Sequence, residues 1–218
     1  MSDEVKNEVV NLGLNLPAGI SDEELAQEAG SGDWLPRVSI VDAKNDLAIN
    51  GEIKAGNLAL FRSKEDADDL TPQIDCIILD ARHKALDISV CVLESHDPES
   101  DLYKRIKKDS AVADSGCLYG PEFLIWVASV KKFATFFCSS KTARRESGKI
   151  SALRGCAATL RTVRIKSAKY SWFGPKISQC STPFEVPSQE VILEQIEKFR
   201  NPPIAEVEEV KEDGGRAR

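Results

Sequence analysis

The feature that most constrains the fold of this chain is a succession of short runs rich in Val, Ile and Leu. Between residues 37 and 93, turn-forming clusters separate these runs, and no long helical pattern intervenes. The runs are VSIVD (38–42), LAINGEI (47–53), NLALFR (57–62), IDCIILD (74–80) and LDISVCV (86–92). Short strands at this spacing are typical of all-β barrels and sandwiches, so the sequence predicts a mainly β fold.

The second half of the chain begins with a polar stretch and then returns to strand-like runs. Residues 94–120 are polar and predict a long loop. The strands expected after this loop are EFLIWVASV (122–130), FATFFC (133–138), TLRTVRIK (159–166) and KYSW (169–172), and the last is followed by a turn at Phe173-Gly174-Pro175.

Two serines in this half indicate helix starts. A serine side chain can accept a hydrogen bond from the free N–H groups of the first helical turn. We therefore expect a short helix after Ser140 and a helix of about three turns after Ser188. In the second helix, Ile192, Ile196 and Phe199 share one face.

Both ends of the chain differ from this β-rich body. Residues 1–36 form an acidic, peripheral segment in which a capping box predicts a helix over 21–29. Residues 37–203 are expected to form the β domain, and residues 204–218 a disordered acidic tail. The N-terminus resembles neither a signal nor a transit peptide, and no stretch reaches the roughly 18 apolar residues of a membrane span. We therefore expect a cytoplasmic protein with no membrane partner.

Charge is strongly segregated along the chain. Residues 103–176 carry sixteen Lys or Arg against four Asp or Glu, a balance of +12. Because the whole chain has a net charge of −6, the remainder carries −18. A basic centre between acidic ends indicates an anionic partner for the centre, with nucleic acid as the leading candidate.

Aromatic residues are interleaved with the cations of this basic stretch. Cations neutralise phosphates and release counterions, and exposed rings stack on bases. On the helix expected after Ser140, Lys141, Arg144 and Arg145 share a face and either contact phosphates or face water. The candidate nucleic-acid-binding residues are Lys131, Lys132, Phe133, Lys141, Arg144, Arg145, Lys149, Arg164, Lys166, Lys169, Tyr170 and Trp172.

The same stretch also has explanations that involve no nucleic acid. Aromatic residues of alternating strands usually belong to the core, and we expect Trp126, Phe136 and Phe137 to be largely buried. Basic residues on strands often form only the solvated face. An acidic protein surface would suit the basic stretch as well, so the sequence leaves these alternatives open.

Common catalytic signatures are absent from the chain, and we expect a noncatalytic protein without a cofactor. The motifs GxxxxGK[ST], GxGxxG, HExxH and GxSxG do not occur. A Mg²⁺-dependent nuclease is the enzymatic alternative, with Asp75, Asp80 and Asp87 near strand ends and His83 as a base. The six cysteines include no CxxC pair, so we expect reduced thiols, with a zinc site as the alternative.

Three segments carry a resemblance to known proteins. GPEFLIWVASVKKFATFF (120–137), SKTARR (140–145) and KYSWFGPKISQCSTPFEVP (169–187) resemble phage-encoded proteins of replication and recombination. The acidic tail after a β-rich body also resembles phage single-stranded-DNA-binding proteins built on the OB-fold. The resemblance spans roughly residues 37–203. It implies an OB-like β-barrel that binds single-stranded DNA without strong sequence preference.

The resemblance also implies partners and a setting. RNA is the alternative ligand, and the acidic tail would dock on replication proteins and compete with DNA for the basic surface. The compartment would be the host cytoplasm, and the sequence leaves a homodimer open. A phage structural or host-defence-inhibiting interaction protein is the alternative function.

Overall fold

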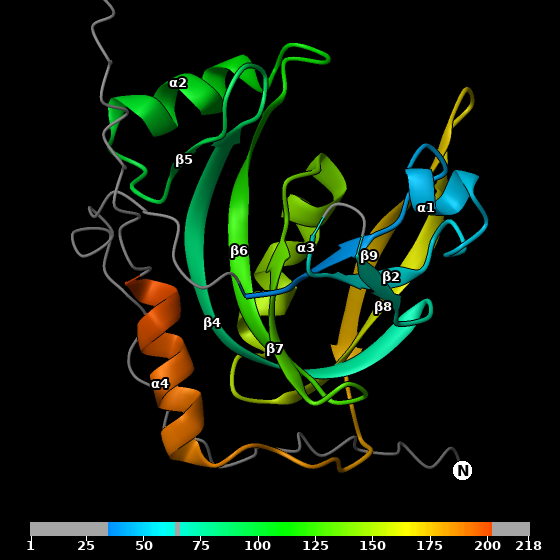
Figure 1. The fold of residues 1–218 in the computed structure, drawn as a ribbon, viewed down its shortest axis with the longest axis vertical. Helices are drawn as coiled ribbons and strands as arrows, with labels where there is room; N and C mark the ends of the chain where they lie inside the picture. The colour runs from blue at the N-terminus through cyan, green and yellow to red at the C-terminus, as the bar shows by residue number, and fades with distance from the viewer. Residues whose placement is uncertain (1–34, 64–65, 202–218) are drawn as a thin grey trace, which may run out of the picture.

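A computed structural model describes residues 35–63 and 66–201, and within these ranges nine strands form one curved sheet (Figure 1). The strands are β1 (Arg37–Ile40), β2 (Leu58–Phe61), β3 (Ala67–Asp69), β4 (Gln73–Asp87), β5 (Leu93–Ser95), β6 (Cys117–Val127), β7 (Lys132–Phe137), β8 (Ala157–Lys166) and β9 (Ser171–Gln179). The helices are α1 (Asp46–Ile49), α2 (Asp101–Asp109), α3 (Lys141–Ala152) and α4 (Gln189–Arg200). The prediction of a mainly β protein with short helices is confirmed.

The strand order is β3-β2-β1-β7-β6-β4-β8-β9, and β5 pairs with the far end of β4. Neighbouring strands are antiparallel except β1 and β7, which run parallel. β3 and β9 stand at opposite ends of this order and, in the described part of the chain, are not paired with each other. The pairing therefore does not show a closed barrel.

β4 is the longest strand and gives the sheet its bend. Its start pairs with β8 and its end with β5, while β6 runs along most of its length. A bulge between Ile78 and Asp80 interrupts the register with β6, and such an extra residue bends a strand. Figure 1 shows β4 curving around α3. The two strands expected over 74–80 and 86–92 are thus one, because the polar residues between them continue to pair with β6.

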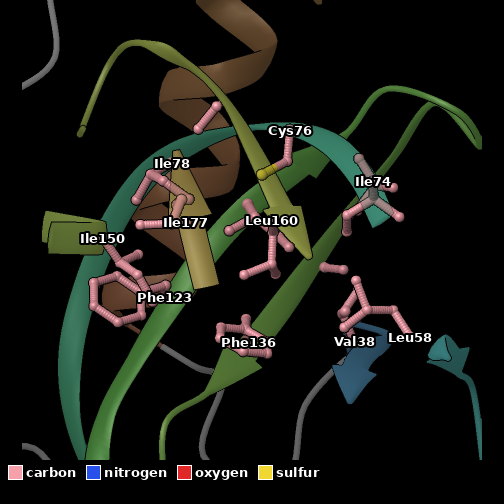
Figure 2. Packing of buried hydrophobic residues seen from close by; sticks show 14 of the residues in the cluster. Val38, Leu58, Ile74, Cys76, Ile78, Phe123, Phe136, Ile150, Leu160 and Ile177 are labelled. Carbon is pink, nitrogen blue, oxygen red and sulfur yellow. The ribbon is translucent and has the colours of Figure 1, made fainter. Parts of the chain in front are cut away.

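The main core fills the concave side of this sheet. Phe123, Ile78 and Leu160 point inward from three neighbouring strands and are buried (Figure 2). Helix α3 contributes Ile150 to the same core, and this side chain is fully buried. Burying one helix face against the sheet therefore holds α3 in place.

Helix α4 covers the opposite, convex face beside β4 (Figure 1). The Ser188 hydroxyl accepts from the backbone N–H of Val191, and Ile192, Ile196 and Phe199 pack on a second apolar cluster with residues of β4 and β6. The predicted cap and apolar face are confirmed. The helix ends at Arg200, directly before Asn201 and two prolines, and proline cannot continue a helix.

Two strand predictions in the first half were wrong. Residues 47–49 of the expected strand LAINGEI belong to the short helix α1, because the Asn45 side chain accepts from the backbone N–H of Leu47 and caps a helical turn. Residues 88–92 of LDISVCV follow the end of β4 and form the turn into β5.

Two predictions in the second half were also wrong. The stretch 94–120 is not one loop, because Ser100 caps α2 and two buried residues of α2 pack on the sheet before β6 begins at Cys117. The turn expected at 173–175 lies inside β9. A proline is tolerated there because β9 is an edge strand, whose outer side needs no N–H donor.

Beyond Arg161, β8 no longer pairs with β4, and residues 162–175 form a two-stranded arm. The arm is held against the loop before β2. The Thr162 hydroxyl donates to the carbonyl of Gly56, and the Phe173 ring lies where a Cβ on Gly56 would come within 2.5 Å. Gly56 has a φ of +93°, so both its conformation and its close contact favour glycine.

The helix expected over 21–29 and the tail expected over 204–218 lie outside the described residues. Among the helices that are described, none is both long and apolar enough to cross a membrane.

Candidate nucleic-acid interface

The exposed side of α3 carries a stripe of cations. The Ser140 hydroxyl accepts from the backbone N–H of Ala143 and starts the helix, which confirms the predicted cap. Lys141, Arg145 and Lys149 follow at intervals of four residues and are exposed, so they share one face. Lys149 forms an ion pair with Glu146 at 3.5 Å.

The arm carries the other group of predicted residues. Its last strand pair joins Lys166 and Ser171. Tyr170, in the turn, is 73% exposed, and Trp172 is 41% exposed. Large apolar rings left in water at a projecting hairpin are available to stack on a ligand.

The two faces of the arm differ in chemistry. Arg164 and Lys166 lie on the face that also carries Phe173, and the Arg164 guanidinium donates to the Ser171 hydroxyl at 3.1 Å. Trp172 lies opposite Ile165 on the other face. The predicted cations of the arm and its tryptophan therefore do not line one face.

The Trp172 face meets α3. The indole Nε1 donates to the hydroxyl of Thr142 at 3.1 Å. Gly174, two residues further along β9, allows this approach, because a Cβ there would come within 2.7 Å of the Thr142 methyl. The structure thus brings together two predicted groups that are far apart in the sequence, the α3 cations and the arm.

A basic pocket of about 470 Å³ opens beside this junction, between the end of α2 and the first turn of α3. Within the part of the chain that the structure describes, no acidic residue lines it. Its polar lining comes from Lys107, Ser110, Tyr119, Lys141, Arg144 and Arg145. Lys141 lines the pocket and its neighbour Thr142 contacts Trp172, so the pocket and the exposed indole are adjacent.

Tyr119 forms the wall of the basic pocket and holds two cations. The Arg144 guanidinium lies 4.2 Å from the centre of its ring, and the Lys107 ammonium lies 5.9 Å from it. Arg144 also donates to the backbone carbonyls of Tyr119 and Ser139. The arginine is therefore fixed, while Lys107 approaches only a ring face.

The pocket cations lack acidic partners. Among the described residues, none of Lys107, Lys141, Arg144 and Arg145 forms an ion pair with a carboxylate. By contrast, Lys104 on the same helix as Lys107 pairs with Glu99 at 2.9 Å. Four converging cations without counter-charge repel one another, and an anionic ligand would relieve that repulsion.

A second cation pair lies on the Trp172 face, and the sequence did not single it out. Arg161 of β8 stands directly opposite Lys176 of β9, and both are exposed. Like charges directly opposite each other destabilise a sheet. The sequence-based prediction missed Lys107, Ser110, Tyr119, Arg161 and Lys176. The signal for Lys107 and Ser110 was the Ser100 cap, which places α2 inside the stretch expected to be a loop.

Three predicted residues lie elsewhere. Lys132 begins β7 and Lys131 directly precedes it, at the end opposite to α3, and Lys131 forms an ion pair with Glu185. Phe133 is half-buried and packs on Trp126, with ring centres 4.9 Å apart. β7 has six residues, so about 20 Å, at ~3.3 Å per residue, separate its start from the end near Ser140.

The carboxylates of the nuclease alternative do not come together. Asp75 accepts from the Thr159 hydroxyl at 2.7 Å. Asp80 is buried and forms ion pairs with Arg154 at 3.0 Å and Arg200 at 2.7 Å. Asp87 lies at the far end of β4, where it accepts from Ser89. Each carboxylate thus has its own protein partners.

One group among the described residues has ligand atoms close enough to hold a metal, and it is Glu94, His96 and Glu122. The ammonium of Lys84 already lies 3.0 Å from both carboxylates. The His96 Nε2 lies 2.8 Å from Glu94, and its Nδ1 donates to the carbonyl of His83 at 2.7 Å. Internal cations therefore neutralise these acids, and the group is a charge network.

Burial and charge act against each other on the acids of this network. Burial alone would raise the pKa of the Glu94 carboxyl, but the hydrogen bond from His96 and the charge of Lys84 lower that pKa to about 2. Burial opposes ionisation of Glu122 as well, and the charges of Lys84 and Arg82 still lower its pKa. Both acids are therefore carboxylates at neutral pH.

Two of the cysteines belong to the main core. Cys76 and Cys138 belong to the concave core, and burial raises the pKa of each thiol to about 12. They are therefore protonated thiols that pack as small apolar side chains. Cys91 is exposed in the turn between β4 and β5.

Comparison with known proteins finds no matching family model, no matching curated protein and no matching solved structure. The resemblance to phage single-stranded-DNA-binding proteins therefore stays a prediction.

Proposed function

We propose that this chain binds single-stranded nucleic acid, with DNA as the ligand and no strong sequence preference. The observation that supports the proposal is the juxtaposition of unpaired cations with an exposed indole at the junction of α3 and the arm. Phosphates attract cations, and any base can stack on a tryptophan. The bond between Trp172 and Thr142 links the arm to the helix that carries Lys141 and Arg145.

Each part of this surface has a separate role in the proposal. Lys141 and Arg145 neutralise phosphates at the start of α3, where the helix dipole also favours negative charge. Trp172 stacks on a base, and its bond to Thr142 holds the ring in one orientation. Arg161 and Lys176 receive phosphates further along the arm. A noncatalytic role, an OB-type barrel, a phage setting and docking of replication proteins on residues 204–218 belong to the same proposal.

A salt titration with two charge-reversal variants tests it. Affinity for an oligothymidylate should fall as salt rises, with log K decreasing by about 0.7 per phosphate contact for each tenfold change in salt. Arg145→Glu should weaken binding about tenfold on every sequence and reduce that slope. Lys198→Glu changes the net charge equally on the distant helix α4 and should leave affinity unchanged.

Two outcomes would overturn the proposal. The first is affinity that does not change with salt, which would remove its electrostatic basis. The second is equal weakening by Arg145→Glu and Lys198→Glu, which would mean that only net charge matters. Loss of affinity on one sequence alone would point to base readout instead.

An interaction role is the second candidate, and an exposed apolar tip favours it. Ile88, Val90 and Val92, in the turn between β4 and β5, are 53%, 95% and 66% exposed. Apolar side chains gathered in water often mark contact with another protein. Val90→Ser together with Val92→Ser should leave DNA affinity unchanged, and under this second candidate it should abolish partner binding.

A further inference from the structure

We infer that the basic pocket binds the terminal phosphate of a nucleic-acid strand and so makes the protein prefer end-phosphorylated strands. The inference rests on the proposed function and deepens it. An internal phosphate is a diester with one negative charge, whereas a terminal phosphate is a monoester with a charge of about −2 at neutral pH and three acceptor oxygens. The charge of the pocket suits a terminal phosphate better than an internal one.

The charge of the pocket exceeds what one phosphodiester needs. Among the described residues, four cations and no carboxylate line the pocket, and none of the four cations is neutralised by an ion pair. On the open surface of the arm, Arg161 and Lys176 offer only two cations at one place. A dianion therefore gains more than a diester from the pocket, because both charges are matched there.

The donors of the pocket are arranged around the Arg144 guanidinium, whose position is fixed. Arg144 is held by two backbone carbonyls and by the Tyr119 ring. Lys107 approaches the same ring from α2, so cations converge from two helices over one aromatic wall. A planar guanidinium and mobile ammonium groups together can reach three phosphate oxygens.

The walls of the pocket also favour a strand end. Residues 107–111 border it on the α2 side, residues 141–145 border it on the α3 side, and Tyr119 of β6 lies at its back. A terminal phosphate presents three oxygens to these elements, whereas an internal phosphate presents two and carries a nucleotide on each side. The exposed Trp172 then lies where the adjoining base can stack.

The test compares the same oligothymidylate with a 5′-phosphate, a 3′-phosphate and two hydroxyl ends. One phosphorylated end should bind about tenfold more tightly than the hydroxyl form at moderate salt, and the preferred end reports strand polarity. Lowering the pH from 7.5 to 5 should reduce that preference, because the second ionisation of a phosphomonoester has a pKa of about 6. Lysine and arginine keep their charge over this range.

Two neighbouring lysines supply the matched variants. Lys107→Gln removes a pocket cation and should lower affinity for the phosphorylated strand about tenfold more than affinity for the hydroxyl-ended strand, so that the preference is abolished. Lys108→Gln removes the next residue of α2, which is exposed and does not line the pocket, and should retain the preference. A thermal shift with thymidine monophosphate but none with thymidine would report the pocket without a strand.

The outcomes separate the two proposals. Equal affinity for phosphorylated and hydroxyl-ended strands would overturn the terminal-phosphate inference and leave single-strand binding intact. A preference that survives Lys107→Gln, or that Lys108→Gln also abolishes, would place the phosphate elsewhere and overturn it too. Absence of binding to all three strands would overturn the proposed function and, with it, this inference.

Discussion

The indole Nε1 of Trp172 donates a 3.1 Å hydrogen bond to the hydroxyl of Thr142, which lies 30 residues earlier in the chain. This bond joins the edge strand β9 to the first turn of α3. A ring that is 41% exposed is thereby held in one orientation beside the cations of the basic pocket. An oriented ring loses less entropy when a base stacks on it.

Removing the acceptor should therefore weaken binding less than removing the ring. Trp172→Ala should cost about 1–3 kcal/mol of binding free energy, whereas Thr142→Val should cost about 0.5–1 kcal/mol. Fluorescence anisotropy of a labelled oligonucleotide measures both affinities. Unchanged affinity in Trp172→Ala would show that the ligand lies elsewhere.

Charge reversal at Lys131, just before β7, and at Arg145, on α3, should differ in its effect on DNA affinity. Lys131→Glu breaks an exposed ion pair with Glu185, which contributes little to stability, and should leave DNA affinity within about twofold. Arg145→Glu should weaken affinity about tenfold. Filter binding or anisotropy measures both. A strong effect of Lys131→Glu would restore the sequence-based prediction that the β6–β7 turn contacts nucleic acid.

A methyl group at Gly120 should displace Arg144, one of the residues that line the basic pocket. Gly120 has a φ of +153°, and a Cβ there would meet the Cys138 carbonyl at 2.3 Å and the Arg144 side chain at 3.2 Å. Gly120→Ala should therefore destabilise the fold by about 2 kcal/mol and displace Arg144. Denaturant unfolding gives the stability change. Unchanged stability would mean that the backbone shifts freely at this position.

Ionisation of the Glu94 carboxyl should make the free energy of unfolding depend on pH. Its pKa in the fold is about 2, below the value of 4.5 that an unperturbed Glu has. Its contribution is therefore present above about pH 5 and is lost as pH falls toward 2, on the order of 3 kcal/mol in total. In urea unfolding at several pH values, the free energy of unfolding of Glu94→Gln should fall less steeply toward acid pH than that of the parent protein. Parallel curves would contradict this assignment.

Neutralising Asp80 should loosen α4. The carboxylate is buried between Arg154 and Arg200, and the second of these arginines belongs to α4. Asp80→Asn removes the carboxylate with which both arginines form ion pairs and should cost about 3 kcal/mol of unfolding free energy. Glu99→Gln, which breaks the exposed pair with Lys104, should leave the free energy of unfolding nearly unchanged. Similar losses from both substitutions would show that the Asp80 pairs contribute no more than a surface pair.

Local patterns in the sequence were enough to predict several elements. Ser140 and Ser188 were predictable N-caps because a cap depends on hydrogen bonds within one turn. The hairpin of β6 and β7 was predictable because its alternating apolar residues are close in sequence. The helices α1 and α2 were missed, although Asn45 and Ser100 cap them by the same local chemistry.

Local patterns also predicted which residues are cationic or aromatic, and where along the chain they concentrate. They did not predict which of them meet. Charge and aromatic content are properties of each residue, whereas a surface depends on how distant segments pack.

Only the tertiary structure decided the candidate site. Lys107 reaches the basic pocket because Tyr103 and Ile106 bury one face of α2 against the sheet. Trp172 reaches Thr142 because β8 pairs with β4 and brings the edge strand β9 to α3. The same packing leaves Lys131 at the other end of β7. Contacts between residues far apart in the sequence depend on the register and curvature of a whole sheet, and no short stretch of sequence encodes either of them.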